Sequence, residues 1–204
     1  MTISTEEIRT TVEKYLAEYP DECDRVARLC EAVDDGSTPA SRTEFRGHVT
    51  CAAVLVDPAF RVLHLHHSAR MRWVLPGGHI DPTDDSLPGA ALRELYEGAG
   101  LEPDTLAPLP GFEVTPIDID VHRVPADLDK DEPDHWHFNI RHAFRVTGAP
   151  TIRVHPDGVS RADWLTLDAV PGFGLRLKLR AIAAFAQPER PPYQSAWSDL
   201  DTAG

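Results

Sequence analysis

Residues 75–101 read LPGGHIDPTDDSLPGAALRELYEGAGL, and this stretch decides the fold. The first residues of the stretch predict the end of a strand, followed by a tight turn at Gly77 and Gly78. Ser86 is a residue type that caps helix N-termini, and Gly100 is the type that most often ends helices. The stretch therefore predicts a strand, a polar loop through Asp85, and a helix that begins at Ser86 and ends at Gly100.

The predicted helix carries two carboxylates on one face. Residues three and four apart lie side by side on a helix, so Glu94, Glu97 and position 98 project together. They point away from the apolar stripe that contains Leu92 and Leu95. Hard divalent cations such as Mg²⁺ prefer one or two carboxylates together with waters and substrate phosphates. This helix face with Glu94 and Glu97, the ridge, therefore predicts a divalent-cation site. The alternative is a solvated acidic helix face.

The same stretch resembles the Nudix box. That box begins with Gly, followed by five residues, a Glu and seven further residues. It ends with Arg-Glu, an aliphatic residue, any residue, Glu-Glu, any residue, Gly and an aliphatic residue. Here Gly78 leads, seven residues separate Asp85 from Arg93, and Arg93 to Leu101 fill the end. The resemblance extends by strand order over most of residues 44–187, and it implies a Nudix-like α/β/α sandwich with a mixed β-sheet.

The resemblance also implies an activity. The family hydrolyses a phosphoanhydride bond in a nucleoside diphosphate linked to another group, with Mg²⁺ or Mn²⁺ as cofactor. The implied catalytic residues are Glu94 and Arg93, which orients the carboxylates, and the implied metal ligands are Glu94, Glu97 and Asp85. Gly77 and Gly78 match the loop that shapes the substrate site, and His79 lies in this loop, near enough to bind substrate. The expected partner is therefore a small nucleotide-type molecule.

Position 98 departs from the family pattern. Gly98 stands where the box has its second adjacent Glu, so the predicted cation site is one carboxylate short. Restoring a glutamate at this position is expected to raise activity. The alternative from a different functional class is a catalytically weakened or inactive module that kept the fold and binds a nucleotide or metabolite.

Two predicted strands after the helix carry alternating polar residues. Because side chains alternate between the faces of a strand, residues 117–124 present Asp118, Asp120 and His122 on one face, and residues 135–146 present His135, His137 and Asn139. These faces predict a polar substrate pocket. Converging His122, His135 and His137 would suit Zn²⁺, Mn²⁺ or Fe²⁺, which defines a third possibility, a His-rich transition-metal hydrolase. The alternative is that both faces meet solvent.

Three segments organise the chain. Residues 1–42 form an extension in which apolar residues at helical spacing over 4–35 predict a helical hairpin. Residues 43–188 form the Nudix-like domain, with further strands expected at 49–56, 60–66, 111–115 and 164–165 and a last helix at 175–186. Residues 189–204 are a tail. The hairpin is expected to join a homodimer interface, to cover the site as a lid, or to fold back on its own domain.

Composition limits the partners. Lys and Arg number 20 against 33 Asp and Glu, a formal charge of −13, which disfavours nucleic acid and anionic lipid. The N-terminus has no signal-peptide pattern and no apolar run can span a bilayer, so a cytoplasmic location without membrane contact is expected. The three cysteines, Cys23, Cys30 and Cys51, are an odd number without a C-x-x-C pair, which fits neither a disulfide framework nor a zinc knuckle, and they are expected to be reduced core residues.

Overall fold

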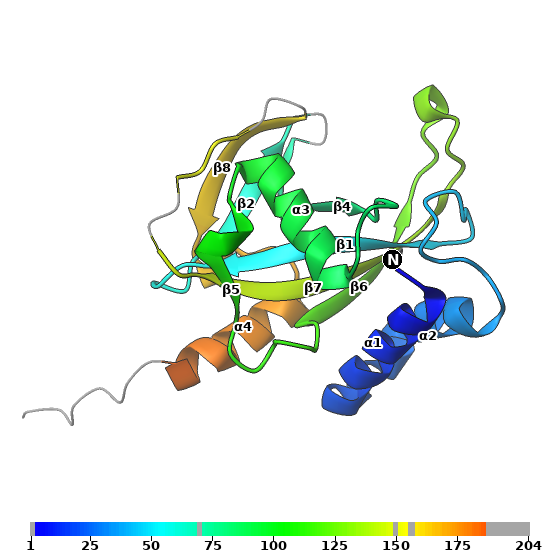
Figure 1. Cartoon of the computed structure of the whole chain (residues 1–204), viewed down its shortest axis with the longest axis horizontal. Helices are drawn as coiled ribbons and strands as arrows, with labels where there is room; N and C mark the ends of the chain where they lie inside the picture. Colours follow the sequence, from blue (N-terminus) through cyan, green and yellow to red (C-terminus); the bar gives the residue numbers. More distant parts are fainter. Residues whose placement is uncertain (1–2, 69–70, 149–150, 155–157, 187–204) are drawn as a thin grey trace, which may run out of the picture.

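A mixed β-sheet forms the centre of the molecule (Figure 1). The structure is a computed structural model that describes residues 3–68, 71–148, 151–154 and 158–186. The strands in this part of the chain are β1 (His48–Val56), β2 (Val62–His67), β3 (Arg72–Val74), β4 (Gly77–His79), β5 (Leu106–Pro108), β6 (Asp118–Val124), β7 (His135–Val146) and β8 (Val159–Leu165). The predicted strands at 49–56, 60–66, 117–124 and 135–146 are confirmed within a few residues.

Strand β1 is the middle of the sheet, and all nine of its residues are buried. It pairs in parallel with β7 and antiparallel with β2 and β4. Strand β6 lies at the edge beyond β7, with His122 opposite His137. This register places the polar faces of β6 and β7 side by side and continues them onto the start of β1.

Helices cover both faces of the sheet, so the predicted α/β/α sandwich is confirmed. On one face Cys51 and Ala53 of β1 pack in the same core as Leu95 of helix α3 (Leu87–Ala99). On the other face Val54 packs in a second core with Leu175 of helix α4 (Phe173–Ala186). Alternate residues of one strand therefore serve two cores, as strand geometry requires.

The N-terminal extension is a helical hairpin, as predicted. It consists of α1 (Thr5–Glu18), a 3₁₀ turn at Pro20–Glu22 and α2 (Cys23–Asp34). Ile8, Val12 and Leu29 are almost fully buried and belong to the core that also contains α3. Of the three expected arrangements, the described chain therefore shows the hairpin folded back on its own domain.

The hairpin also protects an exposed sheet edge. Edge strands leave backbone groups without a pairing strand, which favours aggregation unless other groups satisfy them. Here the Tyr15 hydroxyl accepts from the Ile119 backbone N–H at 3.3 Å, and the Arg25 guanidinium donates to the Ile119 carbonyl at 2.6 Å. Two helices that precede the domain in sequence therefore close the β6 edge.

Three expectations differ from the structure. Residues 111–115 form no strand; Gly111 adopts a positive φ of 88° and the Phe112 N–H donates to the Leu109 carbonyl, which makes a turn. The expectation of three core cysteines is wrong for Cys23, which is exposed, because it opens α2 rather than facing the core; Cys51 is buried. The predicted tail at 189–204 lies outside the described residues.

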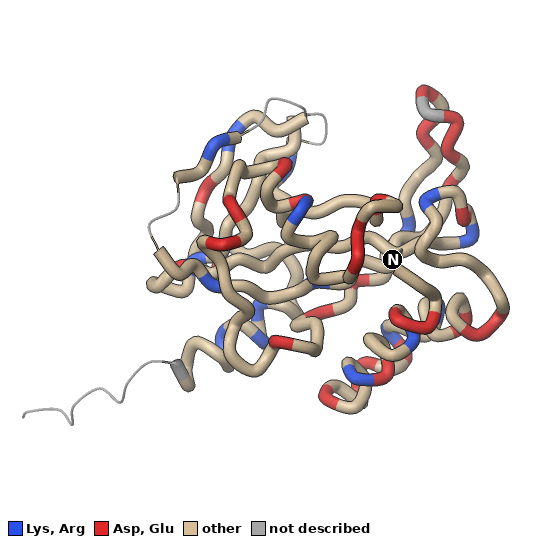
Figure 2. Tube along the Cα trace, in the orientation of Figure 1, with Lys and Arg blue, Asp and Glu red and all other residues tan. Residues whose placement is uncertain are grey.

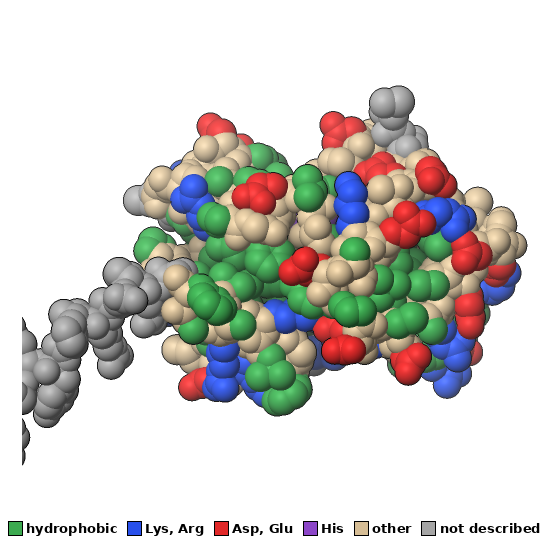
Figure 3. Space-filling model, turned by 90° about the horizontal axis from the view of Figure 1, so that it is seen from below, with side chains coloured by type: hydrophobic (Ala, Val, Ile, Leu, Met, Phe, Trp, Pro, Cys, Tyr) green, Lys and Arg blue, Asp and Glu red, His purple; other side chains and the backbone are tan. Residues whose placement is uncertain are grey.

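Acidic residues dominate the outer loops and the hairpin (Figure 2). The loop between β6 and β7 alone carries Asp127, Asp129, Asp131, Glu132 and Asp134. On the side of α4, Figure 3 shows apolar side chains among acidic and basic ones, and α4 exposes Phe173, Leu177 and Phe185. Among the described residues, no helix is both long and apolar enough to cross a membrane.

Candidate active site

Local sequence signals place α3 where the predicted ridge needs it. The Ser86 hydroxyl accepts from the Gly89 backbone N–H at 3.2 Å and caps the first turn. Gly100 ends the helix with a φ of 63°, a left-handed conformation that glycine adopts without strain. The buried side of α3 includes Leu87 and Leu95, so the face with Glu94 and Glu97 lies beside the β4 loop.

Arg93 binds three carboxylates. Its Nε and Nη2 donate to the two oxygens of Asp84 at 2.9 and 3.0 Å, a bidentate pair. Its Nη1 donates to Glu94 at 2.9 Å and to Glu97 at 3.1 Å. Nη2 also donates to the His79 carbonyl at 2.8 Å. Arg93 therefore joins the β4 loop to both carboxylates of the ridge, which is the orienting position that the resemblance implied.

The loop carboxylate that meets Arg93 is Asp84 and not Asp85. Asp84 is 6% exposed, and its carboxylate also accepts from the Asp81 backbone N–H at 2.7 Å. The exposed Asp85 accepts from the Ser86 hydroxyl at 3.1 Å. Five residues separate Gly78 from Asp84, as in the box, so the extra residue lies between Asp84 and Arg93. Counting back seven residues from Arg93 leads to Asp85 instead.

Glu94 is the buried member of the ridge. Its side chain is 17% exposed, and burial raises its pKa, although Arg93 opposes the rise. A Cβ at Gly78 would lie 2.5 Å from the Glu94 carboxylate oxygens, so a side chain there would displace the end of Glu94. At Gly77 glycine is required, because a Cβ would lie 2.6 Å from the Cys51 carbonyl oxygen. Both glycines therefore shape the site as the resemblance implied, by close packing.

Glu97 and Gly98 differ from Glu94 in their surroundings. Glu97 is 56% exposed. A Cβ at Gly98 would lie 2.5 Å from Cδ1 of Leu65, a buried residue of β2, so the missing carboxylate position faces packed leucine. Glu94, Glu97, Gly98 and Leu65 all line a cavity of about 500 Å³ between α3 and the β2/β8 side of the sheet.

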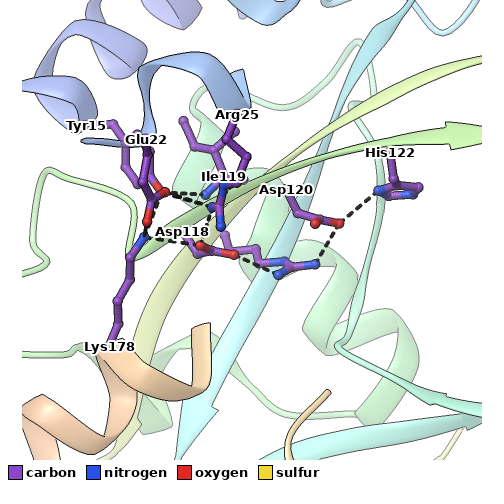
Figure 4. A network of polar contacts seen from close by, with 9 residues as sticks. Tyr15, Glu22, Arg25, Asp118, Ile119, Asp120, His122 and Lys178 are labelled. Carbon is purple, nitrogen blue, oxygen red and sulfur yellow. Dashed lines mark hydrogen bonds and ion pairs between the residues drawn. The ribbon is translucent and has the colours of Figure 1, made fainter. Parts of the chain in front are cut away.

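Asp118 was expected to bind substrate, and the structure places it in an ion-pair network (Figure 4). Its side chain is 1% exposed, and its oxygens lie 2.6 Å from Arg25, 2.7 Å from Arg141 and 3.2 Å from Lys178. Burial raises the pKa of Asp118, but the three cations outweigh this effect and hold the pKa below its ordinary value. Asp118 joins the hairpin, the sheet and α4, so its contacts are those of a structural residue.

Asp120 and His122 form a separate pair farther along the same strand (Figure 4). The His122 Nδ1 lies 2.9 Å from the Asp120 carboxylate, which Arg141 also contacts at 3.0 Å. The hydrogen bond to His122 and the nearby Arg141 lower the pKa of Asp120 to about 2, against a smaller effect of burial. The pair remains partly exposed and lies on the polar face that the sequence predicted.

Five histidines gather where β1, β4, β6 and β7 meet. Neighbouring ring centroids are 4.8 to 5.6 Å apart, and the members are His48, His79, His122, His135 and His137. Burial, followed by the neighbouring imidazoles, lowers the pKa of His137 to about 2, and burial lowers the pKa of His79 to about 4. The predicted convergence of His135 and His137 is therefore present.

Sequence reasoning missed His48. It directly precedes the apolar run of β1, and only the parallel pairing of β1 with β7 brings it opposite His137. The signal available in the sequence was the position of His48 at the start of a strand beside the expected polar strands. The structure thus replaces His122 by His48 as the third close imidazole.

A larger cavity of about 900 Å³ lies on the other side of Glu94, between the extension and the box loop. Its wall includes Ile3, Thr5, Arg42, Gly78, His79 and Glu94. This volume lies within the range of sites for small molecules, roughly 300–1,000 Å³. The extension therefore forms one wall of a cavity whose opposite wall is the box.

The chain belongs to the NUDIX family: the model of the NUDIX domain matches residues 46–185. Among solved structures, it is similar to an Ap4A hydrolase from C. elegans, with 19% identity, a TM-score of 0.50, and coverage of 67% of this chain and 96% of that chain. The dihydroneopterin triphosphate pyrophosphohydrolase of E. coli is similar at 15% identity and a TM-score of 0.48, over 68% of this chain and 96% of that one. No curated protein matches the chain.

Proposed function

We propose that this NUDIX-family chain hydrolyses a phosphoanhydride bond in a small nucleotide-type substrate, with Mg²⁺ or Mn²⁺ as cofactor. The observation that carries the proposal is the arrangement of Arg93, Glu94 and Glu97: one guanidinium holds both ridge carboxylates, and Glu94 lines both cavities while Glu97 lines the smaller one. Carboxylate oxygens are the donors that these cations prefer, and Mg²⁺ commonly takes only one or two of them.

The residues fit such a cation in spite of Gly98. The glycine at position 78 leaves room against the Glu94 carboxylate that any side chain would fill. Among the described residues, no donor is bound to the second oxygen of Glu94, while the first accepts from Arg93. Glu94 and Glu97 would hold the cation, which when bound neutralises the charge of a pyrophosphate group.

Side chains of the protein orient the reacting groups and bind the substrate. Arg93 fixes the direction of Glu94 through the first carboxylate oxygen, and we assign the second oxygen either to the cation or to the proton of an attacking water. The 900 Å³ cavity, with Arg42 and His79 in its wall, is the place that we assign to the substrate. We also assign metal or substrate contacts to Asp85, Asp120 and His122, which lie outside the wall of this cavity.

The test is hydrolysis by the full chain of a panel of nucleoside triphosphates, dinucleoside polyphosphates, ADP-ribose and nucleotide sugars, with Mg²⁺ or Mn²⁺. We expect release of a monophosphate product that Glu94→Gln slows by roughly 100-fold, the effect typical of losing a principal electrostatic contributor. The matched control is Glu102→Gln, an exposed carboxylate just beyond α3, which should leave the rate unchanged.

One observation favours a second function. Leu65 fills the direction in which a carboxylate at position 98 would project, which suits a module that binds a nucleotide without cleaving it. If no panel member is cleaved with either cation while one or more of them raises the melting temperature, the binding function replaces the hydrolase.

A further inference from the structure

His48 presents a buried nitrogen without a partner. The side chain is 1% exposed, and its Nδ1 lies 3.2 Å from the Glu44 carbonyl oxygen. Because a carbonyl only accepts hydrogen bonds, Nδ1 carries the proton and Nε2 keeps its lone pair. No hydrogen-bond partner is present for this Nε2 among the described residues. An unpaired buried acceptor is costly, so the orientation of His48 needs an explanation.

His135 is oriented in the same way. Its Nδ1 lies 2.7 Å from the Pro133 carbonyl oxygen, so its Nε2 also keeps a lone pair, and the residue is 2% exposed. That Nε2 lies 3.1 Å from Nε2 of His137. A backbone carbonyl that holds one imidazole nitrogen and aims the other is the usual support of a metal-ligating histidine.

We propose that His48, His135 and His137 form a binding site for a transition-metal dication of the Zn²⁺ class. One ring nitrogen from each residue lies within 4.8 Å of those of the other two. Zn–N bonds of about 2.0–2.1 Å in a tetrahedron place neighbouring nitrogens roughly 3.3 Å apart, close to the observed 3.1 Å between His135 and His137. The longest separation, at most 4.8 Å, has to shorten by at most about 1.5 Å to match a tetrahedral site.

The donor chemistry selects this class of cation. Imidazole nitrogen suits Zn²⁺, Co²⁺, Ni²⁺ and Cu²⁺, whereas Mg²⁺ prefers oxygen ligands. Three protein nitrogens leave a fourth position for water or an anionic ligand. The site is therefore chemically distinct from the carboxylate ridge, and it stands whether or not the proposed hydrolase function holds.

The cation would lie next to the 900 Å³ cavity. His79 lines that cavity, and its ring centroid is 5.0 Å from that of His48 and 5.2 Å from that of His137. In a chain with a formal charge of −13, a dication here adds positive charge beside a cavity that we assign to an anionic substrate.

The test is a Co²⁺ titration of the full chain, prepared without a histidine tag and stripped of metal. Co²⁺ occupies Zn²⁺ sites and has a visible absorption band that reports nitrogen coordination. We expect one equivalent of Co²⁺ to bind and added Zn²⁺ to displace it. His48→Gln and His137→Gln should each weaken binding by about tenfold or more, as loss of metal-site residues does.

Two controls separate this site from its neighbours. His64→Gln removes another buried histidine, on β2, and should leave the titration unchanged. Glu94→Gln with Glu97→Gln removes the ridge carboxylates and should also leave it unchanged, while abolishing any Mn²⁺ site on α3. His137 is only partly buried, so its variant serves if His48→Gln fails to fold. Co²⁺ binding that survives His137→Gln, or that disappears with the ridge carboxylates, overturns the proposal.

Discussion

Asp118 is a buried carboxylate and Glu94 is a partly buried one, and their surroundings differ. Asp118 is 1% exposed and contacts three cations from three separate elements of the fold. Glu94 is 17% exposed and shares a single guanidinium with Asp84 and Glu97. The cations lower the pKa of Asp118 despite its burial, whereas burial raises the pKa of Glu94 despite Arg93. The buried charge of Asp118 is therefore balanced by several cations, whereas Glu94 has one cationic partner that it shares with two other carboxylates.

This difference indicates a structural role for Asp118 and a functional role for Glu94. A buried charge with several hydrogen-bonded partners holds elements together, and removing it leaves those partners uncompensated. A buried carboxylate with an incomplete set of partners costs stability and is kept where it binds or reacts. Burial and charge of a carboxylate therefore indicate a functional site only when the number of its hydrogen-bonded partners is considered as well.

The first prediction concerns stability and has the largest expected effect. Asp118→Asn should lower the free energy of unfolding by about 3 kcal/mol, because Arg25, Arg141 and Lys178 lose their common partner. Glu94→Gln should leave stability unchanged or raise it. Urea unfolding followed by circular dichroism measures both, and Asp120→Asn, on the same strand face but 38% exposed, is the matched control with a smaller loss. Equal losses for Asp118→Asn and Glu94→Gln would break the comparison.

The second prediction is an acid-dependent form of the first. Since the folded-state pKa of Asp118 lies below its unfolded value of about 3.9, its stabilisation is complete above that pH. It is lost as the pH falls through the folded-state pKa. The stability gap between the wild type and Asp118→Asn should therefore narrow steadily below pH 4. Unfolding curves at a series of pH values measure the gap, and a gap that stays constant would assign the stabilisation to packing.

Much of the fold could be predicted because its signals are local. Ser86 and Gly100 mark the ends of α3, and alternation in residues 135–146 matches the bounds of β7. The candidate site was harder to predict from the sequence. Choosing between Asp84 and Asp85 depended on which carboxylate Arg93 reaches, and His48 joins His137 only through parallel strand pairing. Such contacts between distant segments have no local signature in the sequence.

The last prediction concerns position 98, where the sequence alone predicts that a glutamate raises activity. A Cβ there would lie 2.5 Å from Cδ1 of Leu65, which is 4% exposed, so Gly98→Glu alone should overpack this contact and lower stability by about 1–3 kcal/mol. Combining it with Leu65→Ala makes room for the carboxylate beside Glu94 and Glu97.

We expect this double variant to hydrolyse the best substrate of the panel faster, with Mn²⁺, than Leu65→Ala alone. The matched control is Gly98→Ala with Leu65→Ala, which fills similar space at position 98 without a carboxylate and should gain nothing. A gain in both double variants would attribute the effect to space and not to charge. A gain in neither would mean that the third carboxylate is not what limits turnover, and Gly98→Glu that is active and fully stable by itself would show that Leu65 yields readily.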